Sequence, residues 1–227
     1  MGLSTLTPPP VTSLVVSTAE LAAYLRLPLL PSDPNDFLLY NLLREAQEYL
    51  ERETEQQLFT ATKLQTLDFF PGGNCMGDWA GEWPYGQSSP VAPNMMAQRP
   101  FSREIRLRTP PLQSVTSVTY VYQGQTLTLS PSLYTVDAVG LPGRIVLNGG
   151  QVWPATDIVA NAVQITYVCG YGASPSSIPT SFKTAVRWFA NHLYENREAA
   201  TANNLKELPI GLQSLIESLM FREATGA

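Results

Sequence analysis

The side chains that most often carry out chemistry are scarce in this chain of 227 residues. Histidine occurs once, as His192, between Trp188 and Glu195 on the less apolar side of a helix-patterned segment. With a carboxylate three residues on, it could act as a general base, but a histidine at a surface or an interface fits the same pattern. The sequence has no Gly-x-Ser-x-Gly motif to supply a nucleophile. We therefore expect no catalytic residue and no enzymatic activity.

Motifs for cofactors and metals are equally weak. Gly170-Tyr171-Gly172 follows a strand pattern and precedes a helix pattern, as a dinucleotide-binding loop would, but Pro175 stands where the third glycine should be. Cys75 and Cys169 are far apart, and with one histidine they cannot form a zinc site. Glutamates on a helical segment fit a solvated helix face better than a metal or acid–base cluster; they are Glu45, Glu51, Glu53 and Glu55. We expect no cofactor and no metal.

Charge and hydropathy argue against two classes of partner. The net charge is −5 and Lys and Arg form no cluster, whereas a protein that holds DNA by its phosphates normally shows a basic stripe. No apolar run approaches the roughly 18 residues that span a bilayer, so we expect no membrane contact. The start of the chain lacks a signal-peptide pattern. A soluble intracellular protein of one domain, or of one domain with an insertion, is expected.

The first part of the chain predicts an arm and a short helix. Pro8-Pro9-Pro10 favours an extended conformation, so residues 1–14 are expected to be an arm, either frayed or ordered by a neighbouring subunit. A helix over 17–27 should follow. Ser17 and Glu20 have the spacing of a capping box, in which each side chain bonds to the backbone N–H of the other residue.

Three further helices are expected from apolar residues at helical spacing. The first covers 34–56, with Pro34 in its first turn. The others cover 179–198 and 209–221, and each begins at a proline. Residues 222–227 form a polar tail.

The middle of the chain has the composition of an antiparallel sheet. Residues 62–70 and 104–170 are rich in Val, Ile, Thr and Tyr and are divided by turn residues, among them Gln123-Gly124. The segment Val163–Cys169 alternates apolar and polar residues. The sequence therefore predicts an α+β fold: a small helical bundle of two N-terminal and two C-terminal helices, with an inserted antiparallel sheet and a long irregular loop.

That loop, residues 71–100, is an irregular insertion with five glycines and five prolines and no periodicity. It also carries large apolar side chains that argue against simple disorder. Because the glycines make the loop costly to order alone, we expect these side chains to contact a partner. The residues are Trp79, Trp83, Tyr85, Met95 and Met96.

The sheet region also offers aromatic side chains that could stack against a sugar or single-stranded nucleic acid. Ordinary packing within the sheet explains them as well. They are Tyr120, Tyr122, Trp153 and Tyr167.

Several motifs together resemble the head–tail connector proteins of long-tailed bacteriophages and prophages, which are also called adaptor or head-completion proteins. The resemblance covers about Val15 to Phe221, and the chain differs from the family at 71–100, where relatives usually have a much shorter connection. The matching pieces are Val16-Ser17-Thr18-Ala19-Glu20 with Tyr24-Leu25-Arg26, a second helix ending near Gln57-Leu58, IRLRTPPLQSVTSVTYV, SLYTVD, LPGRIVL, VWPAT, NAVQITYVCGYG, Ile178-Pro179, Tyr194-Glu195-Asn196-Arg197-Glu198 and Leu208-Pro209.

The resemblance implies one connector domain over 15–221, a helical bundle interrupted by a β insertion. It also implies an oligomeric ring, commonly of twelve copies, that docks under the portal and presents a surface to a stopper or tail-terminator protein. Genomic DNA would pass through the lumen without sequence-specific binding. The negative net charge agrees with this, because cationic walls would retain phosphates. The protein would be made in the host cytoplasm and located in the virion neck.

In the family, the C-terminal segment commonly contacts the portal. The corresponding residues here are Leu212, Ile216, Phe221 and Arg222. We therefore expect a non-enzymatic structural virion protein that joins the portal to the tail. The main alternative is a soluble binding module whose β face holds a carbohydrate or a peptide, and a small enzyme comes third.

Overall fold

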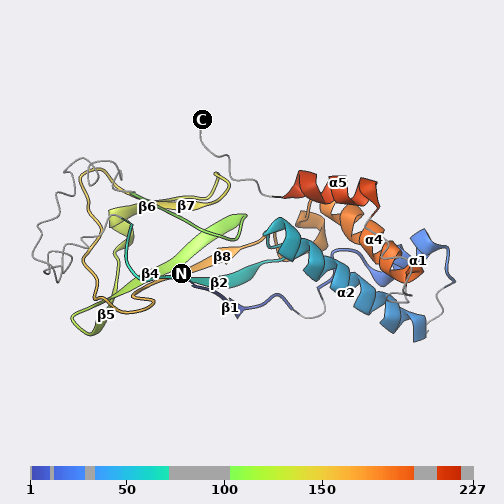
Figure 1. Cartoon of the computed structure of the whole chain (residues 1–227), viewed down its shortest axis with the longest axis horizontal. Helices are drawn as coiled ribbons and strands as arrows, with labels where there is room; N and C mark the ends of the chain where they lie inside the picture. Colours follow the sequence, from blue (N-terminus) through green and yellow to red (C-terminus); the bar gives the residue numbers. More distant parts are fainter. Residues whose placement is uncertain (1, 11–12, 29–33, 72–102, 197–208, 221–227) are drawn as a thin grey trace, which may run out of the picture. The chain divides into compact units, whose positions relative to one another are not determined.

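The structure is a computed structural model that describes residues 2–10, 13–28, 34–71, 103–196 and 209–220 (Figure 1). The chain divides into two compact units, and each is described by itself. The β unit comprises Met1–Leu6, Thr62–Arg108 and Leu112–Val168; the helical unit comprises Thr7–Ala61, Thr109–Pro111 and Cys169–Ala227. Where the sequence suggested one domain with an insertion, the β segments pack mainly on one another and form a unit of their own.

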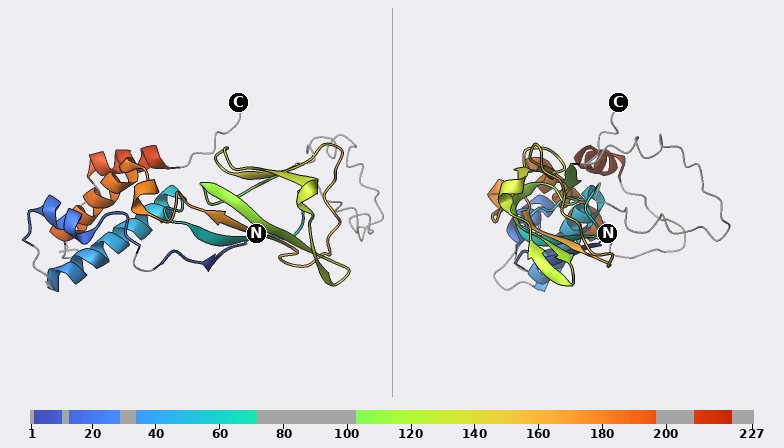
Figure 2. Two further views of the ribbon diagram at one scale, coloured as in Figure 1. Left: turned by 180° about the vertical axis from the view of Figure 1, so that it is seen from behind. Right: turned by 90° about the vertical axis from the view of Figure 1, so that its left-hand side faces the viewer.

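The described part of the helical unit contains four α-helices, as the sequence predicts (Figure 2). Each observed helix lies inside its expected range and is slightly shorter, because a terminal turn lacks part of its backbone hydrogen bonding. The helices are α1 (Thr18–Leu25), α2 (Pro34–Thr54), α4 (Thr180–Glu195) and α5 (Ile210–Leu219).

The first helix begins at the predicted capping box. The backbone N–H of Glu20 donates to Ser17 Oγ over 3.2 Å, and the Ser17 N–H donates to Glu20 Oε2 over 3.0 Å. At the other end Arg26 adopts a left-handed conformation, with φ of 56°, and its N–H reaches the carbonyls of Ala22 and Ala23. Local sequence therefore determines both ends of α1.

The core of the helical unit is the apolar stripe of α2 packed against α4 and α5. Tyr49 of α2 stacks on Phe189 of α4 with ring centroids 4.4 Å apart. Burying each large aliphatic side chain stabilises the fold by about 1.5–3 kcal/mol, so these stripes supply most of the packing energy. In the described ranges, none of the helices is long and apolar enough to cross a membrane.

The β unit contains two sheets. The larger has five strands in the order β1 (Gly2–Thr7), β2 (Ala61–Leu67), β8 (Val163–Cys169), β4 (Leu112–Tyr122) and β5 (Gln125–Thr128). The smaller has three antiparallel strands in the order β3 (Glu104–Arg106), β7 (Arg144–Leu147) and β6 (Tyr134–Asp137). Two short 3-10 helices, η1 (Pro131–Leu133) and η2 (Pro175–Ser177), complete the described elements.

The first strand corrects one expectation. Residues 1–14 were expected to be an arm, but Gly2–Thr7 form β1 at the edge of the chain's own sheet. The Gly2 N–H donates to Thr66 Oγ1, and Lys63 Nζ donates to Thr5 Oγ1, so β1 runs antiparallel to β2. The strand ends at Thr7, directly before the three prolines, because prolines cannot donate to a sheet ladder.

Two local predictions in the sheet are confirmed. Gln123 and Gly124 have φ angles of 52° and 73° and join β4 to β5 in a tight hairpin. In β8 the residues Val163, Ile165, Tyr167 and Cys169 are all buried, while Gln164 is exposed. The alternation places one face of β8 in the core of the sheet.

Two close contacts join the small sheet to the large one. The side chain of Gln65 in β2 is fully buried; its Nε2 donates to the Arg106 carbonyl and its Oε1 accepts from the Arg108 N–H, both over 3.0 Å. Gly143, just before β7, packs so closely on Leu112 that a Cβ there would lie 2.5 Å from the Leu112 Cβ. The two sheets are therefore held in a defined arrangement within the β unit.

Candidate interaction surface of the β unit

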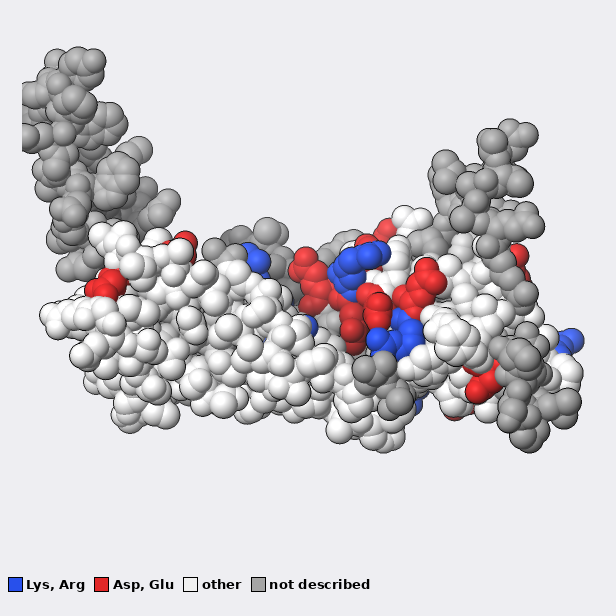
Figure 3. All heavy atoms as spheres, turned by 90° about the horizontal axis from the view of Figure 1, so that it is seen from below, with Lys and Arg blue, Asp and Glu red and all other residues white. Residues whose placement is uncertain are grey.

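Charged side chains are rare in the long stretch that supplies five of the strands, β4 to β8. Between Thr109 and Phe182 only Asp137, Arg144 and Asp157 are charged. In the face shown in Figure 3, the part formed by the β unit is mostly white. A surface with so few charges loses little hydration energy when another protein covers it, whereas buried charges are costly unless they are paired.

The two acidic residues of this stretch each hold a turn of backbone. Asp137 Oδ1 accepts from the N–H groups of Val139 (3.2 Å) and Gly140 (3.1 Å). Asp157 accepts from the N–H groups of Gln123 (2.9 Å) and Gly124 (2.7 Å), the two residues of the β4–β5 turn. Both carboxylates are therefore engaged in stabilising loops.

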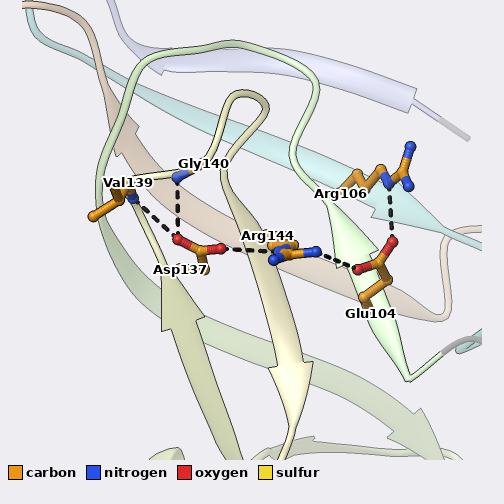
Figure 4. Close-up of polar contacts among 6 residues, drawn as sticks. All are labelled: Glu104, Arg106, Asp137, Val139, Gly140 and Arg144. Carbon is orange, nitrogen blue, oxygen red and sulfur yellow. Dashed lines mark hydrogen bonds and ion pairs between the residues drawn. The ribbon is translucent and has the colours of Figure 1, made fainter. Parts of the chain in front are cut away.

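The small sheet carries a chain of ion pairs across its strands (Figure 4). Arg144 in the central strand β7 donates through Nε to Asp137 of β6 (2.9 Å) and through Nη1 to Glu104 of β3 (3.1 Å). Glu104 also accepts from Arg106 Nε over 3.0 Å. Because Arg106 and Arg144 are direct cross-strand neighbours, Glu104 offsets a repulsion that would otherwise weaken the pair.

These contacts also set the pKa values of the network. The Gly140 N–H and then the Arg144 guanidinium, both bonded to the Asp137 carboxylate, hold the pKa of Asp137 below its usual value of 3.8. The hydrogen bonds from Arg144 to Asp137 and Glu104 raise the pKa of Arg144 from its ordinary value. Asp137, on the edge strand β6, is therefore ionised at neutral pH.

The two edges of the large sheet are different. The strand β1 reads GLSTLT and the strand β5 reads QTLT, with no charged residue and no proline in either. All four residues of β5 are exposed, and in β1 only Gly2 is partly covered. Within the described part of the chain, each is the last strand of the sheet on its side. Both edges thus present backbone N–H and C=O groups for pairing.

Exposed aliphatic side chains lie in the β6–β7 loop, which Asp137 holds, and in the β7–β8 loop, which Asp157 connects to the β4–β5 turn. Val139 and Leu141 project from the β6–β7 loop, with Val139 95% exposed. Val152 and Ile158, which is 88% exposed, lie between β7 and β8. Apolar side chains on loops with fixed backbones are well suited to contact another protein surface.

Two of the interface residues expected from the sequence are not available to a partner. Leu212 and Ile216 of α5 are 2% and 4% exposed and belong to the core of the helical unit. The amphipathic face of α5 packs on the chain's own α2 and α4, which covers both side chains within one copy. The other interface candidates lie outside the described residues, namely Trp79, Trp83, Tyr85, Met95, Met96, Phe221 and Arg222.

His192 and Gly170, which the sequence offered as candidates for chemistry, make contacts that belong to the fold. His192 Nδ1 lies 3.2 Å from the side-chain nitrogen of Asn196, and its ring stacks on Phe189. Gly170 follows β8, where its N–H donates to the Pro111 carbonyl and its Cα lies against the backbone of Phe59. Across the described ranges, no three His, Cys, Asp or Glu side chains are grouped as a metal site would require.

A groove of about 610 Å³ in the helical unit has a lining that includes Ser17, Glu20, Asp36 and Lys183. Ser17 and Glu20 are already bonded to each other's backbone in the cap of α1.

The aromatic side chains of the sheet are largely engaged with one another. Trp153 stacks on Phe70 at 4.8 Å with the rings 6° from parallel, and Tyr120 meets the edge of Phe70 at 5.7 Å. Tyr167 is fully buried, and only Tyr122 is substantially exposed. Packing explains these residues better than a stacking platform for a sugar or nucleic acid.

Comparison with known proteins finds the fold in particle necks. The chain is similar to a chain in the neck of an empty GTA particle computed with C6 symmetry, with 23% identity, a TM-score of 0.70 and coverage of 100% of this chain and 99% of that one. It is also similar to chains in the virion of a native gene transfer agent (GTA) particle (21% identity, TM-score 0.68) and in the neck of a native GTA particle computed with C12 symmetry (22%, 0.63), with the same coverage.

No protein-family model matches the chain, and no curated protein sequence matches it. At this level of identity the structural likeness shows the fold. The resemblance to head–tail connectors drawn from the sequence is confirmed to that extent, over the whole chain.

The open edges of the large sheet were not identified from the sequence. Their signal was present in the uncharged run from Thr109 to Val136 and in the uncharged segment Gly2–Thr7. A run without charge reads equally well as buried strand, however, so it could be interpreted only once the strand order was known.

Proposed function

We propose that this protein is a structural component of the neck of a phage-like particle, where it forms a ring between the capsid portal and the tail or stopper. The observation that carries the proposal is the likeness of the whole chain, end to end, to chains in the neck and virion of a gene transfer agent particle. A likeness that spans both units indicates that the entire architecture, and not one module, serves the same kind of assembly.

The surface of the β unit supports a ring. A closed ring requires each copy to use two different surfaces, one toward each neighbour. The β unit offers two uncharged sheet edges and exposed aliphatic side chains on well-held loops. Such surfaces are compatible with burial between subunits, because few charges would have to be desolvated.

In this role the ring would extend the channel for DNA. Its partners would be further copies of the chain, the portal protein, and a stopper or tail-terminator protein, and genomic DNA would pass through without sequence-specific binding. The net charge of −5 supports passage rather than retention of DNA. The chain would act by shape and contact, without catalysis, in the neck of the virion, after synthesis in the host cytoplasm.

Electron microscopy of particles and native mass spectrometry of the purified protein would test the proposal. We expect a ring, of six-fold or twelve-fold symmetry, at the vertex between head and tail, and particles made without this protein should have heads that lack tails. A protein found only as a monomer, together with normally tailed particles in its absence, would overturn the proposal.

A further inference from the structure

We infer that β1 of one copy pairs with β5 of the next copy, so that the large sheets of neighbouring subunits join edge to edge. This inference rests on the proposed function, because it names the contact by which the ring would close. The partner at each edge is a second copy of this chain, and the contact is made by backbone hydrogen bonds.

The backbone of β5 is directed outward in the required way. Gln123 and Gly124 form a two-residue turn, so Tyr122 and Gln125 are a hydrogen-bonded pair, and the next pair, Val121 with Thr126, is a non-hydrogen-bonded one. The contacts of Val121 agree with this pattern. Its N–H donates to the Ala162 carbonyl (2.8 Å) and its C=O accepts from the Asp157 N–H (2.9 Å), both away from β5.

Thr126 faces Val121 across the ladder, so its own N–H and C=O point away from β4, toward the open edge. Thr128 lies two residues further on and has the same orientation. The edge therefore offers two residues whose donors and acceptors can bind an added strand, which is the geometry of β-strand addition.

The choice of edges follows from the contrast between the two sheets. The edge strands of the small sheet carry Glu104, Arg106 and Asp137, and charged side chains on an edge strand oppose pairing with another strand. Neither β1 nor β5 carries a charge or a proline. Of the four sheet edges in the described part of the chain, these two are the ones left open to pairing.

The pairing of unlike edges follows from symmetry. Contacts between β1 and β1, or between β5 and β5, would be two-fold and would stop at a dimer. A contact between β1 and β5 leaves one free edge of each kind on every pair, so it can be repeated until a ring closes. Successive copies would then form one continuous band of sheet.

A proline at the edge tests the inference. Thr126→Pro removes the N–H that points toward the open edge. The fold of a single copy should tolerate the proline, because that N–H faces solvent and not β4. We expect Thr126→Pro to keep the far-ultraviolet circular dichroism of the wild type and a cooperative unfolding transition but to lose ring assembly in native mass spectrometry. The matched control, Thr126→Val, keeps the N–H and should assemble normally. Rings formed by a folded Thr126→Pro protein at wild-type concentration would overturn the inference and leave the proposed function standing.

Cysteine cross-linking identifies the two edges. In a Cys75→Ser background, copies with Ser4→Cys and copies with Thr126→Cys that carries a mass tag are mixed under assembly conditions and oxidised. Disulfide-linked pairs of one tagged and one untagged copy are expected, and none from either variant alone. Pairs formed by one variant alone would show two-fold contacts and overturn the inference. If the wild type itself forms no ring, the proposed function fails first.

Discussion

The two sheets of the β unit differ in whether their edge strands carry charged side chains. The small sheet places Glu104 and Arg106 on one edge strand and Asp137 on the other, and Arg144 of the central strand binds both acids (Figure 4). The large sheet has no charge on either edge strand. Because an unprotected strand edge is a template for another strand, the contrast indicates that the large sheet is built to be extended and the small one to end.

The contrast holds only while both sheets keep their places in one unit. Gly143 and Gln65 supply that connection, one by close packing and one by hydrogen bonds. Substitutions at Gly143 and Gln65 should disturb the packing of the two sheets on each other. Substitutions on the edge strands should change the charge or the pairing of an edge without unfolding the chain.

The largest effect is expected from Gly143→Ala. The new Cβ would lie 2.5 Å from the Leu112 Cβ, so either the β6–β7 loop or the start of β4 must move. Overpacking of this kind costs about 1–3 kcal/mol. We expect a cost near the upper end, because the Leu112 Cβ is attached to the backbone and cannot move by a change of rotamer. Urea unfolding would measure the loss. Gly149→Ala is the control, since nothing lies within 4 Å of a Cβ there, and an equal loss in both variants would contradict the contact.

The second-largest effect is expected from Gln65→Leu. The substitution keeps the side chain buried but removes the bonds to the Arg106 carbonyl and the Arg108 N–H. We expect a loss of about 1–3 kcal/mol, because both backbone groups lose a partner. Hydrogen exchange at Arg108 should speed up more than exchange in β8. The exposed Gln164 gives a matched control, and Gln164→Leu should be nearly neutral. Unchanged exchange at Arg108 would show that Gln65 does not connect the sheets.

The third prediction concerns pH. The pKa of Asp137 is lowered in the folded protein, so its contribution to stability is present above its ordinary value of 3.8 and is lost as the pH falls through the lower folded value. Asp137→Asn should be less stable than the wild type at neutral pH, and the two should converge in strong acid. Thermal unfolding across this range measures the difference, which isolates Asp137 because the other carboxyl groups titrate in both proteins. A difference independent of pH would mean that the charge of Asp137 has no role.

The smallest effect on stability is expected from a lysine on the open edge. Thr128→Lys in β5 should change the free energy of unfolding by no more than about 0.5 kcal/mol, because the position is exposed. It should weaken assembly, and a cost of about 1 kcal/mol at each contact corresponds to roughly a five-fold change in the concentration required. Gln164→Lys places the same charge at an exposed position of β8, the central strand of the large sheet, away from both edges, and should assemble normally. Equal effects of the two lysines would make charge, and not the edge, responsible.

Local sequence determined the helices and turns of this protein. The cap at Ser17 and Glu20 starts α1, and the turn at Gln123-Gly124 makes the hairpin, because both depend on groups a few residues apart. The apolar stripes of α2 and α4 predicted which faces are buried. The sequence also carried the resemblance to connector proteins, since that likeness is a matter of motif order along the chain.

Tertiary structure alone decided which surfaces are free. The same apolar pattern in α5 suits a partner or the chain's own core, and packing against α2 and α4 places Leu212 and Ile216 in the core. The segment Gly2–Thr7 carries no charge, and only its pairing with β2 makes it an edge strand. Whether a strand is central or at an edge depends on partners far away in sequence, and so does the contrast between the charged and uncharged edges of the two sheets.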